Sequence, residues 1–183
     1  MTKTIPGVLF ALAAVALALP TQAGTTGGGT PPTIVKSGRN DNSLYVGINW
    51  NFGARDGATA VLGYRGAKVK SNGHVDGFKV EATWVLSGAP MGFGEARVKY
   101  LNGKRSVQGE VGVGYSVAHQ AFLINGGVQG PYANAGVDYL FDKGYLASIG
   151  VNSLNRVKEP KETQTCPSAT TFDGTLCIPD SID

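Results

Sequence analysis

The chain has few of the residues from which catalytic, redox and metal sites are usually built. Its 183 residues include two histidines and two cysteines, and no Gly-x-Ser-x-Gly, His-Glu-x-x-His or Cys-x-x-Cys motif occurs in it. The closely spaced glycines of "GEVGVGYSV" have no helical pattern after them, which excludes a dinucleotide-binding loop. We therefore expect no catalytic residue, no metal site and no cofactor, and we interpret His74 and His119 as loop side chains in contact with solvent.

Charged residues are also scarce, and the two signs nearly balance. They make up 16% of the chain, and the formal net charge is +3. A chain so close to neutral gives no reason to expect nucleic acid or a strongly charged partner.

Long apolar runs are missing after the N-terminus. Residues 1–23, "MTKTIPGVLFALAAVALALPTQA", contain one lysine, an apolar run and then small residues, which is typical of a cleaved secretory signal peptide. No later stretch is continuously apolar for the roughly 18 residues that a membrane-spanning helix requires. The sequence therefore predicts an exported protein without a transmembrane helix.

Helical periodicity is absent as well, and 27 glycines disfavour helix. Alternation takes its place: in "FKVEATWVL", residues 78–86, every second side chain is apolar, as in a strand with one apolar and one polar face. Eight such runs follow one another, with turn signals such as Asn102-Gly103 between them. They cover residues 44–52, 58–67, 75–86, 92–101, 105–117, 120–129, 132–141 and 144–153.

Eight consecutive strands with short connections predict an all-β fold, an up-and-down antiparallel β-barrel over residues 43–154. The runs are longer than the ~5–6 residues of an ordinary strand and match the ~9–11 residues of a tilted transmembrane strand. Before the barrel, the Gly-, Thr- and Pro-rich residues 24–42 are predicted to be a flexible linker. After it, the polar residues 155–183 are predicted to be a tail in the same compartment as the linker.

The polar face of the eight runs carries equal numbers of positive and negative charges. A closed interior requires such a balance, because an unpaired buried charge costs several kcal/mol, on the order of its desolvation penalty. We therefore expect an interior ion network, with small residues such as Gly63 and Gly112 making room for long side chains. The predicted network is Arg65, Lys79, Glu81, Glu95, Arg97, Lys99, Glu110 and Asp138.

The apolar face carries aromatic residues near the ends of the runs, where the interfacial girdles of membrane barrels lie. The predicted girdle is Trp50, Phe52, Trp84, Tyr100, Tyr115, Tyr139, Phe141 and Tyr145.

Over residues 43–154 the pattern resembles the small eight-stranded outer-membrane barrels, such as the OmpX-like proteins and the membrane domain of OmpA. "NAGVDYLF", residues 134–141, is similar to their C-terminal assembly signal, although here one more strand follows it. The resemblance implies a transmembrane barrel of the bacterial outer membrane, in contact with lipid, that has a structural or partner-anchoring role and no enzymatic one.

Two other interpretations stay open. A soluble, lipocalin-like exported barrel also alternates, but its apolar face points inward around a small apolar ligand. A lipid-modifying outer-membrane enzyme would use a histidine with a serine, and Ser116 lies near His119 in the sequence. In every case export favours a disulfide between Cys166 and Cys177 in the tail, and a periplasmic or membrane protein is a possible partner of that tail.

Overall fold

A computed structural model describes residues 29–88 and 91–180 of the chain. The predicted signal peptide and the first residues of the predicted linker lie outside the described residues. In the described ranges every regular element is a strand, and no helix there has the length and apolar character needed to cross a membrane.

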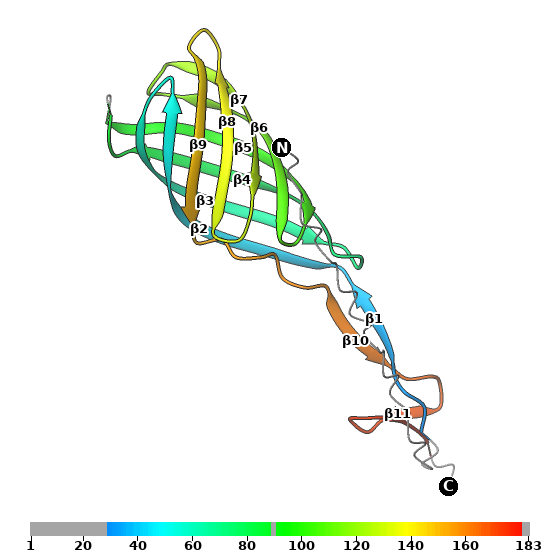
Figure 1. Cartoon of the computed structure of the whole chain (residues 1–183). Coiled ribbons are helices and arrows are strands. Elements are labelled where there is room, and N and C mark those ends of the chain that lie inside the picture. Colours follow the sequence, from blue (N-terminus) through cyan, green and yellow to red (C-terminus); the bar gives the residue numbers. More distant parts are fainter. Residues whose placement is uncertain (1–28, 89–90, 181–183) are drawn as a thin grey trace, which may run out of the picture.

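Eight strands close into an antiparallel barrel in which each strand pairs with the next along the chain and the last pairs with the first (Figure 1). The predicted all-β, up-and-down barrel is confirmed. Its strands are β2 (Arg39–Gly53), β3 (Gly57–Val69), β4 (His74–Val85), β5 (Gly92–Lys104), β6 (Val107–Ser116), β7 (Ala121–Gln129), β8 (Ala133–Leu140) and β9 (Gly144–Asn152).

Both described chain ends leave the barrel at the same end, which we call the terminus side; the opposite end is the far side (Figure 1). They do not leave as a flexible linker and a separate tail. Strand β1 (Thr33–Ser37) pairs with β10 (Lys161–Thr165) in an antiparallel ribbon, and beyond it β11 (Thr170–Phe172) pairs with β12 (Cys177–Pro179). We call residues 30–37 and 161–180 the stalk.

The predicted linker therefore differs from the structure over residues 33–42. Residues 33–37 form β1, and β2 begins at Arg39, so that only Gly38 separates the stalk from the barrel wall. The reason is that both parts of this segment have a partner strand. Residues 33–37 pair with β10, and residues 39–51 pair with β3. The apolar alternation on which the prediction relied begins only at Leu44.

The terminus-side mouth of the barrel is closed by residues 153–159, which we call the seal. Leu154 packs inside against Tyr45 and Val61, and Val157 packs against a buried cluster that includes Val69 and Val75. Both side chains are almost fully buried, at 2% and 1% exposure. The predicted boundary between barrel and tail at residue 155 thus falls inside a segment that completes the barrel.

Hydrogen bonds hold the seal to three sides of the mouth. Val157 N donates to Arg105 O (3.1 Å), and Arg105 Nε donates back to Val157 O (3.0 Å). Tyr132 N donates to Leu154 O (2.7 Å). Lys158 N donates to the buried carboxylate of Asp41 (3.1 Å). Since these contacts reach β2 and the turns after β5 and β7, the seal joins walls that are far apart along the chain.

One predicted turn is misplaced. Asn102-Gly103 still belongs to the ladder, opposite Gly109 and Gln108, and the chain turns at residues 105–106. The Asn102 amide donates to Asp76 Oδ1 on the neighbouring strand (2.7 Å), so this asparagine is used to join strands.

The seal generates a stability prediction with a matched control. We expect Leu154→Ala to lower the free energy of unfolding by about 2–4 kcal/mol, because it leaves a cavity in the packed mouth. Leu44→Ala removes the same atoms from a side chain that is 77% exposed on the outer wall, and we expect a clearly smaller loss. Denaturant unfolding in detergent micelles measures both. Equal losses would show that the mouth does not depend on Leu154.

Candidate functional site

The barrel interior is filled by ionised side chains. Ten charged residues are buried in the described part of the chain, five carboxylates and five cations. Seven of the eight predicted network residues contact one another, from β4, β5, β6 and β8. The buried carboxylates are Asp41, Glu81, Glu95, Glu110 and Asp138, and the buried cations are Arg55, Arg65, Lys79, Arg97 and Lys99.

The centre of the interior is a ring of two lysines and two glutamates. Lys79 Nζ lies 2.8 Å from both Glu81 Oε1 and Glu110 Oε1. Lys99 Nζ lies 2.8 Å from Glu81 Oε2 and 3.1 Å from Glu110 Oε2. Each carboxylate therefore bridges the same two ammonium groups. Such mutual pairing offsets the cost of removing four charges from water.

Arg97 extends the network toward the far side. Its guanidinium contacts Glu95 and Asp138, and it lies 3.8 Å from Glu81. Asp138 also accepts a hydrogen bond from the Asn125 amide. One arginine thus joins carboxylates from β4, β5 and β8 across the interior.

Tyr45 extends the network toward the seal. Its hydroxyl donates to Glu81 Oε1 (2.5 Å), and the Lys79 ammonium lies 4.9 Å from the centre of its ring. The same ring packs against Leu154 of the seal. Tyr45 therefore connects the ion network to the apolar closure of the mouth.

Arg65 is the predicted network residue that lies apart from the other seven. Its guanidinium pairs with Asp41 (3.2 Å) and donates to Asn155 O of the seal (3.2 Å). Its partner Asp41 was not among the predicted site residues, because it lay within the predicted linker. The sequence signal for Asp41 is its spacing: it lies two residues before Ser43 and four before Tyr45, so its side chain is on the same inward face of the strand.

Arg55 is the second buried charge that the sequence did not indicate. It sits in the loop between β2 and β3, at the far side, and its three guanidinium nitrogens have no hydrogen-bond partner among the described residues. Burial lowers the pKa of this guanidinium from its ordinary value, while the negative charge of Glu95 opposes that shift. Nothing in "GARDG" distinguishes Arg55 from an exposed loop arginine.

Inward glycines make the space that these side chains occupy. A Cβ atom at Gly63 would lie 2.4 Å from the Tyr45 ring. At Gly112 it would lie 2.8 Å from Lys99 Cγ, and at Gly114 it would lie 3.1 Å from Arg97 Cγ. The small residues of the polar face are thus required by the long ones opposite them.

The outer wall is the reverse of the interior. Outward side chains such as Leu44, Val113 and Val151 are 62% exposed or more. All eight predicted girdle residues are exposed on this wall, but they do not form one ring. Seven lie at the far side, where β2, β4, β6 and β8 end, and Tyr100 lies at the terminus side, beside Phe78.

The far-side aromatics touch across neighbouring strands and include two residues that were not predicted, Phe93 and Phe122. Trp84 meets Phe93 edge-on at 5.6 Å, and Tyr115 meets Phe122 at 5.1 Å. Tyr139 and Tyr145 lie 5.0 Å apart. A second, smaller aromatic group on the terminus side contains Tyr64, Phe78 and Tyr100.

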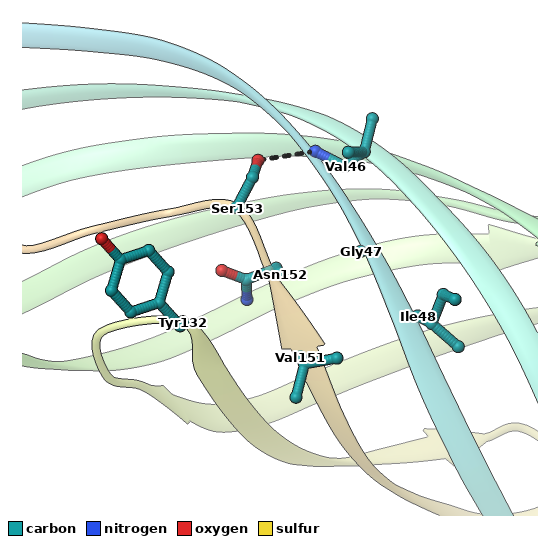
Figure 2. A pocket seen from close by; sticks show the side chains of 7 residues that line it. All are labelled: Val46, Gly47, Ile48, Tyr132, Val151, Asn152 and Ser153. Atoms are coloured by element: carbon teal, nitrogen blue, oxygen red, sulfur yellow. Dashed lines mark hydrogen bonds between the residues drawn. The ribbon is translucent and has the colours of Figure 1, made fainter.

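A shallow apolar hollow lies on the outer wall where the barrel closes (Figure 2). Val46 and Ile48 of β2 face Val151 of β9 across it, with Tyr132 beside them. Ser153 ends the seam: its hydroxyl accepts from Val46 N (3.1 Å), and its own N–H donates to Val46 O (2.9 Å). From Val46 toward the terminus side, β2 has no ladder with β9 and pairs only with β3.

The two histidines are half-buried and hydrogen-bonded, so the expectation of solvated loop side chains was too simple. His74 Nε2 lies 3.4 Å from Asp76 and 3.1 Å from the Asn102 amide, on the terminus side. His119 Nδ1 lies 3.0 Å from Ser116 Oγ, on the far side. Ser116 is completely buried and also accepts from His119 N, so its hydroxyl is shielded from a substrate.

The predicted Cys166–Cys177 disulfide is present, with the two Cα atoms 5.6 Å apart. Its loop turns at Asp173-Gly174, with Asp173 N donating to Leu176 O (3.1 Å). Hydrogen bonds from the backbone N–H groups of Leu176 and Thr175 lower the pKa of the Asp173 carboxyl. In the described residues no group of three His, Cys, Asp or Glu side chains is arranged to hold a metal ion.

Comparison of the chain with protein-family models, with curated proteins and with solved structures gave no match.

The central ring generates the second prediction. We expect Glu81→Gln to lower the free energy of unfolding by about 3–5 kcal/mol, because it leaves two buried ammonium groups with one carboxylate. Glu159→Gln is the control, since it alters an ion pair with Arg105 in which the glutamate is 75% exposed, and we expect a loss of about 0–1 kcal/mol. Unfolding curves in detergent compare the two. If both variants unfold together with the native chain, the interior is hydrated.

Proposed function

We propose that the protein is a transmembrane β-barrel of a bacterial outer membrane that anchors the stalk at the membrane surface and has no catalytic role. The observation that carries the proposal is the polarity of the wall: ionised side chains face inward, and apolar side chains face outward. A soluble ligand-binding barrel requires the opposite arrangement, with an apolar cavity inside.

The height of the apolar band supports the proposal. Outward positions of β2 are apolar from Leu44 to Phe52, and nine residues of a strand tilted by about 40° rise roughly 20–25 Å, close to the ~25 Å apolar band of outer-membrane barrels. Aromatic residues lie at both edges of this band, where Tyr and Trp prefer the membrane–water interface.

An anchoring role fits the filled interior and the continuous stalk better than transport does. The ion network and the seal occupy the space through which a solute would pass. Only Gly38 separates β1 from β2, so the stalk is an extension of the wall. The described loops on the far side are short, which leaves the stalk as the larger surface for a periplasmic or membrane protein partner.

Vesicle insertion tests the proposal. We expect the mature chain, refolded into phosphatidylcholine vesicles, to remain with the vesicles after carbonate and urea washes, and to shift its gel mobility on boiling. Recovery of folded monomer in the wash would contradict the membrane barrel and favour an exported soluble one.

A charge on the outer wall gives a sharper test. We expect Val113→Arg to reduce insertion or to lower stability in vesicles by about 2–4 kcal/mol, as charges do near the midplane of membrane barrels. Val35→Arg makes the same exchange on the stalk, where Val35 is likewise exposed, and should change little. A soluble barrel predicts that neither variant is impaired.

A further inference from the structure

Positive charge collects on one rim of the barrel. Around the terminus-side rim lie seven cations that are exposed or half-exposed, against two carboxylates, Asp76 and Glu159. The described part of the far-side rim carries, at its surface, Asp56, Asp142 and Lys143. We call the seven cations the collar: Arg39, Lys68, Lys70, Lys104, Arg105, Arg156 and Lys158.

Most of this charge is not neutralised by the protein itself. Lys70 pairs with Asp76 (2.6 Å), and Arg105 pairs with Glu159 (2.9 Å). Lys158 approaches Asp41 at 3.8 Å, but that carboxylate is already paired with Arg65. In the described residues the other four collar cations have no carboxylate within 4.0 Å: Arg39, Lys68, Lys104 and Arg156.

The collar lies directly at the edge of the apolar band. On the outer face Lys68 of β3 stands opposite Asp76 of β4 in the strand register, and Asp76 stands opposite Asn102 of β5. The next outward residues of β4 and β5 are Phe78 and Tyr100, which begin the band. Cations adjoining an aromatic edge match the position of the headgroups of a bilayer.

Hollows beside these cations provide room for a headgroup. One, of about 490 Å³, lies between the β3–β4 and β5–β6 turns and is lined by His74, Lys104, Arg105 and small polar residues. A second, of about 240 Å³, is lined by Lys68, Phe78 and Asp76, whose carboxylate is paired with Lys70. Ammonium, guanidinium and amide groups are donors suited to phosphate oxygens.

We propose that the collar binds anionic phospholipid headgroups in the leaflet on the terminus side of the membrane. This inference rests on the proposed membrane insertion. An acidic protein partner is less well matched, because the cations stop at the rim: on the described stalk, Lys36 and Lys161 are offset by Glu162, Asp173 and Asp180.

The test compares the lipids that the inserted protein retains. The mature chain is refolded into bilayer nanodiscs of equimolar phosphatidylcholine and phosphatidylglycerol, and the lipids that remain bound after detergent release are counted by native mass spectrometry. We expect phosphatidylglycerol to be retained preferentially at low salt and the preference to disappear at high salt, since exposed charges are screened. Excess inorganic phosphate at matched ionic strength should not remove it.

The variants remove equal charge from two places. Lys68→Gln, Lys70→Gln and Lys104→Gln together should reduce the preference for phosphatidylglycerol by about tenfold or more, at the usual contribution of a basic residue near an anionic surface. Lys36→Gln, Lys143→Gln and Lys161→Gln together remove three exposed lysines outside the collar, and this control should keep the preference.

The outcomes separate this inference from the proposed function. Insertion without any preference for phosphatidylglycerol, a collar variant that keeps it, or a control that loses it equally would overturn the collar and leave the membrane barrel in place. Competition by inorganic phosphate would replace the lipid with a soluble anion. Failure of the native chain to insert into phosphatidylcholine vesicles would overturn both.

Discussion

Buried charge inside a closed wall is the constraint on which the rest of this structure depends. Five carboxylates and five cations lie where water is largely excluded, and nine of these ten lie within 4.0 Å of a group of opposite charge, which offsets their desolvation. Arg55, in a far-side loop, is the exception among the described residues. Pairing across the barrel fixes which strands must lie opposite one another, as the pair of Arg97 on β5 and Asp138 on β8 does. Because successive side chains of a strand alternate, charges that point inward oblige the apolar side chains to point outward.

Close packing of this network explains several features that look unrelated in the sequence. Glycines in "EVGVGYS" face Lys99 and Arg97, whose methylene stems occupy the space where a Cβ atom would lie. Tyr45 fills the position opposite Gly63 and donates to Glu81. The high glycine content is thus partly the complement of the long ionised side chains.

Alternation made most of the barrel predictable, because each strand displays its two faces within a few residues. All eight strands and seven members of the connected ion network follow from it. Asp41 and Arg55 do not, since one precedes the apolar alternation and the other sits in a loop. Tyr100 was placed in one girdle list with seven aromatics that lie at the far side, because the list was drawn from closeness to a strand end and did not use the alternating direction of the strands.

The seal could not be predicted, because nothing local marks where a strand stops following its ladder. Residues 38–46 and 153–160 both run between the β1–β10 ladder and the β2–β9 ladder, and the two segments are almost equally long. They could therefore have continued to pair with each other as strands. Extending the β2–β9 register would set Val157 beside outward-facing Asn42 and turn Arg156 inward toward Arg65. Leaving the ladder instead buries Val157 with Val69 and Val75 and gives Arg65 the carbonyl of Asn155.

The net charge of the whole chain gives no sign that the exposed cations gather at one end of the barrel. A formal charge of +3 for the whole chain indicated no charged partner, yet the cations that have no partner in the interior lie mainly on one rim. The strand order brings them together: Lys68, Lys70 and Lys104 come from β3, the turn after it and β5, which flank β4 in the barrel. A nearly neutral chain can therefore present a strongly cationic rim, since the buried charges balance at five against five. Of the described carboxylates that are not buried, five lie on the stalk or at the far side and only Asp76 and Glu159 lie at the cationic rim.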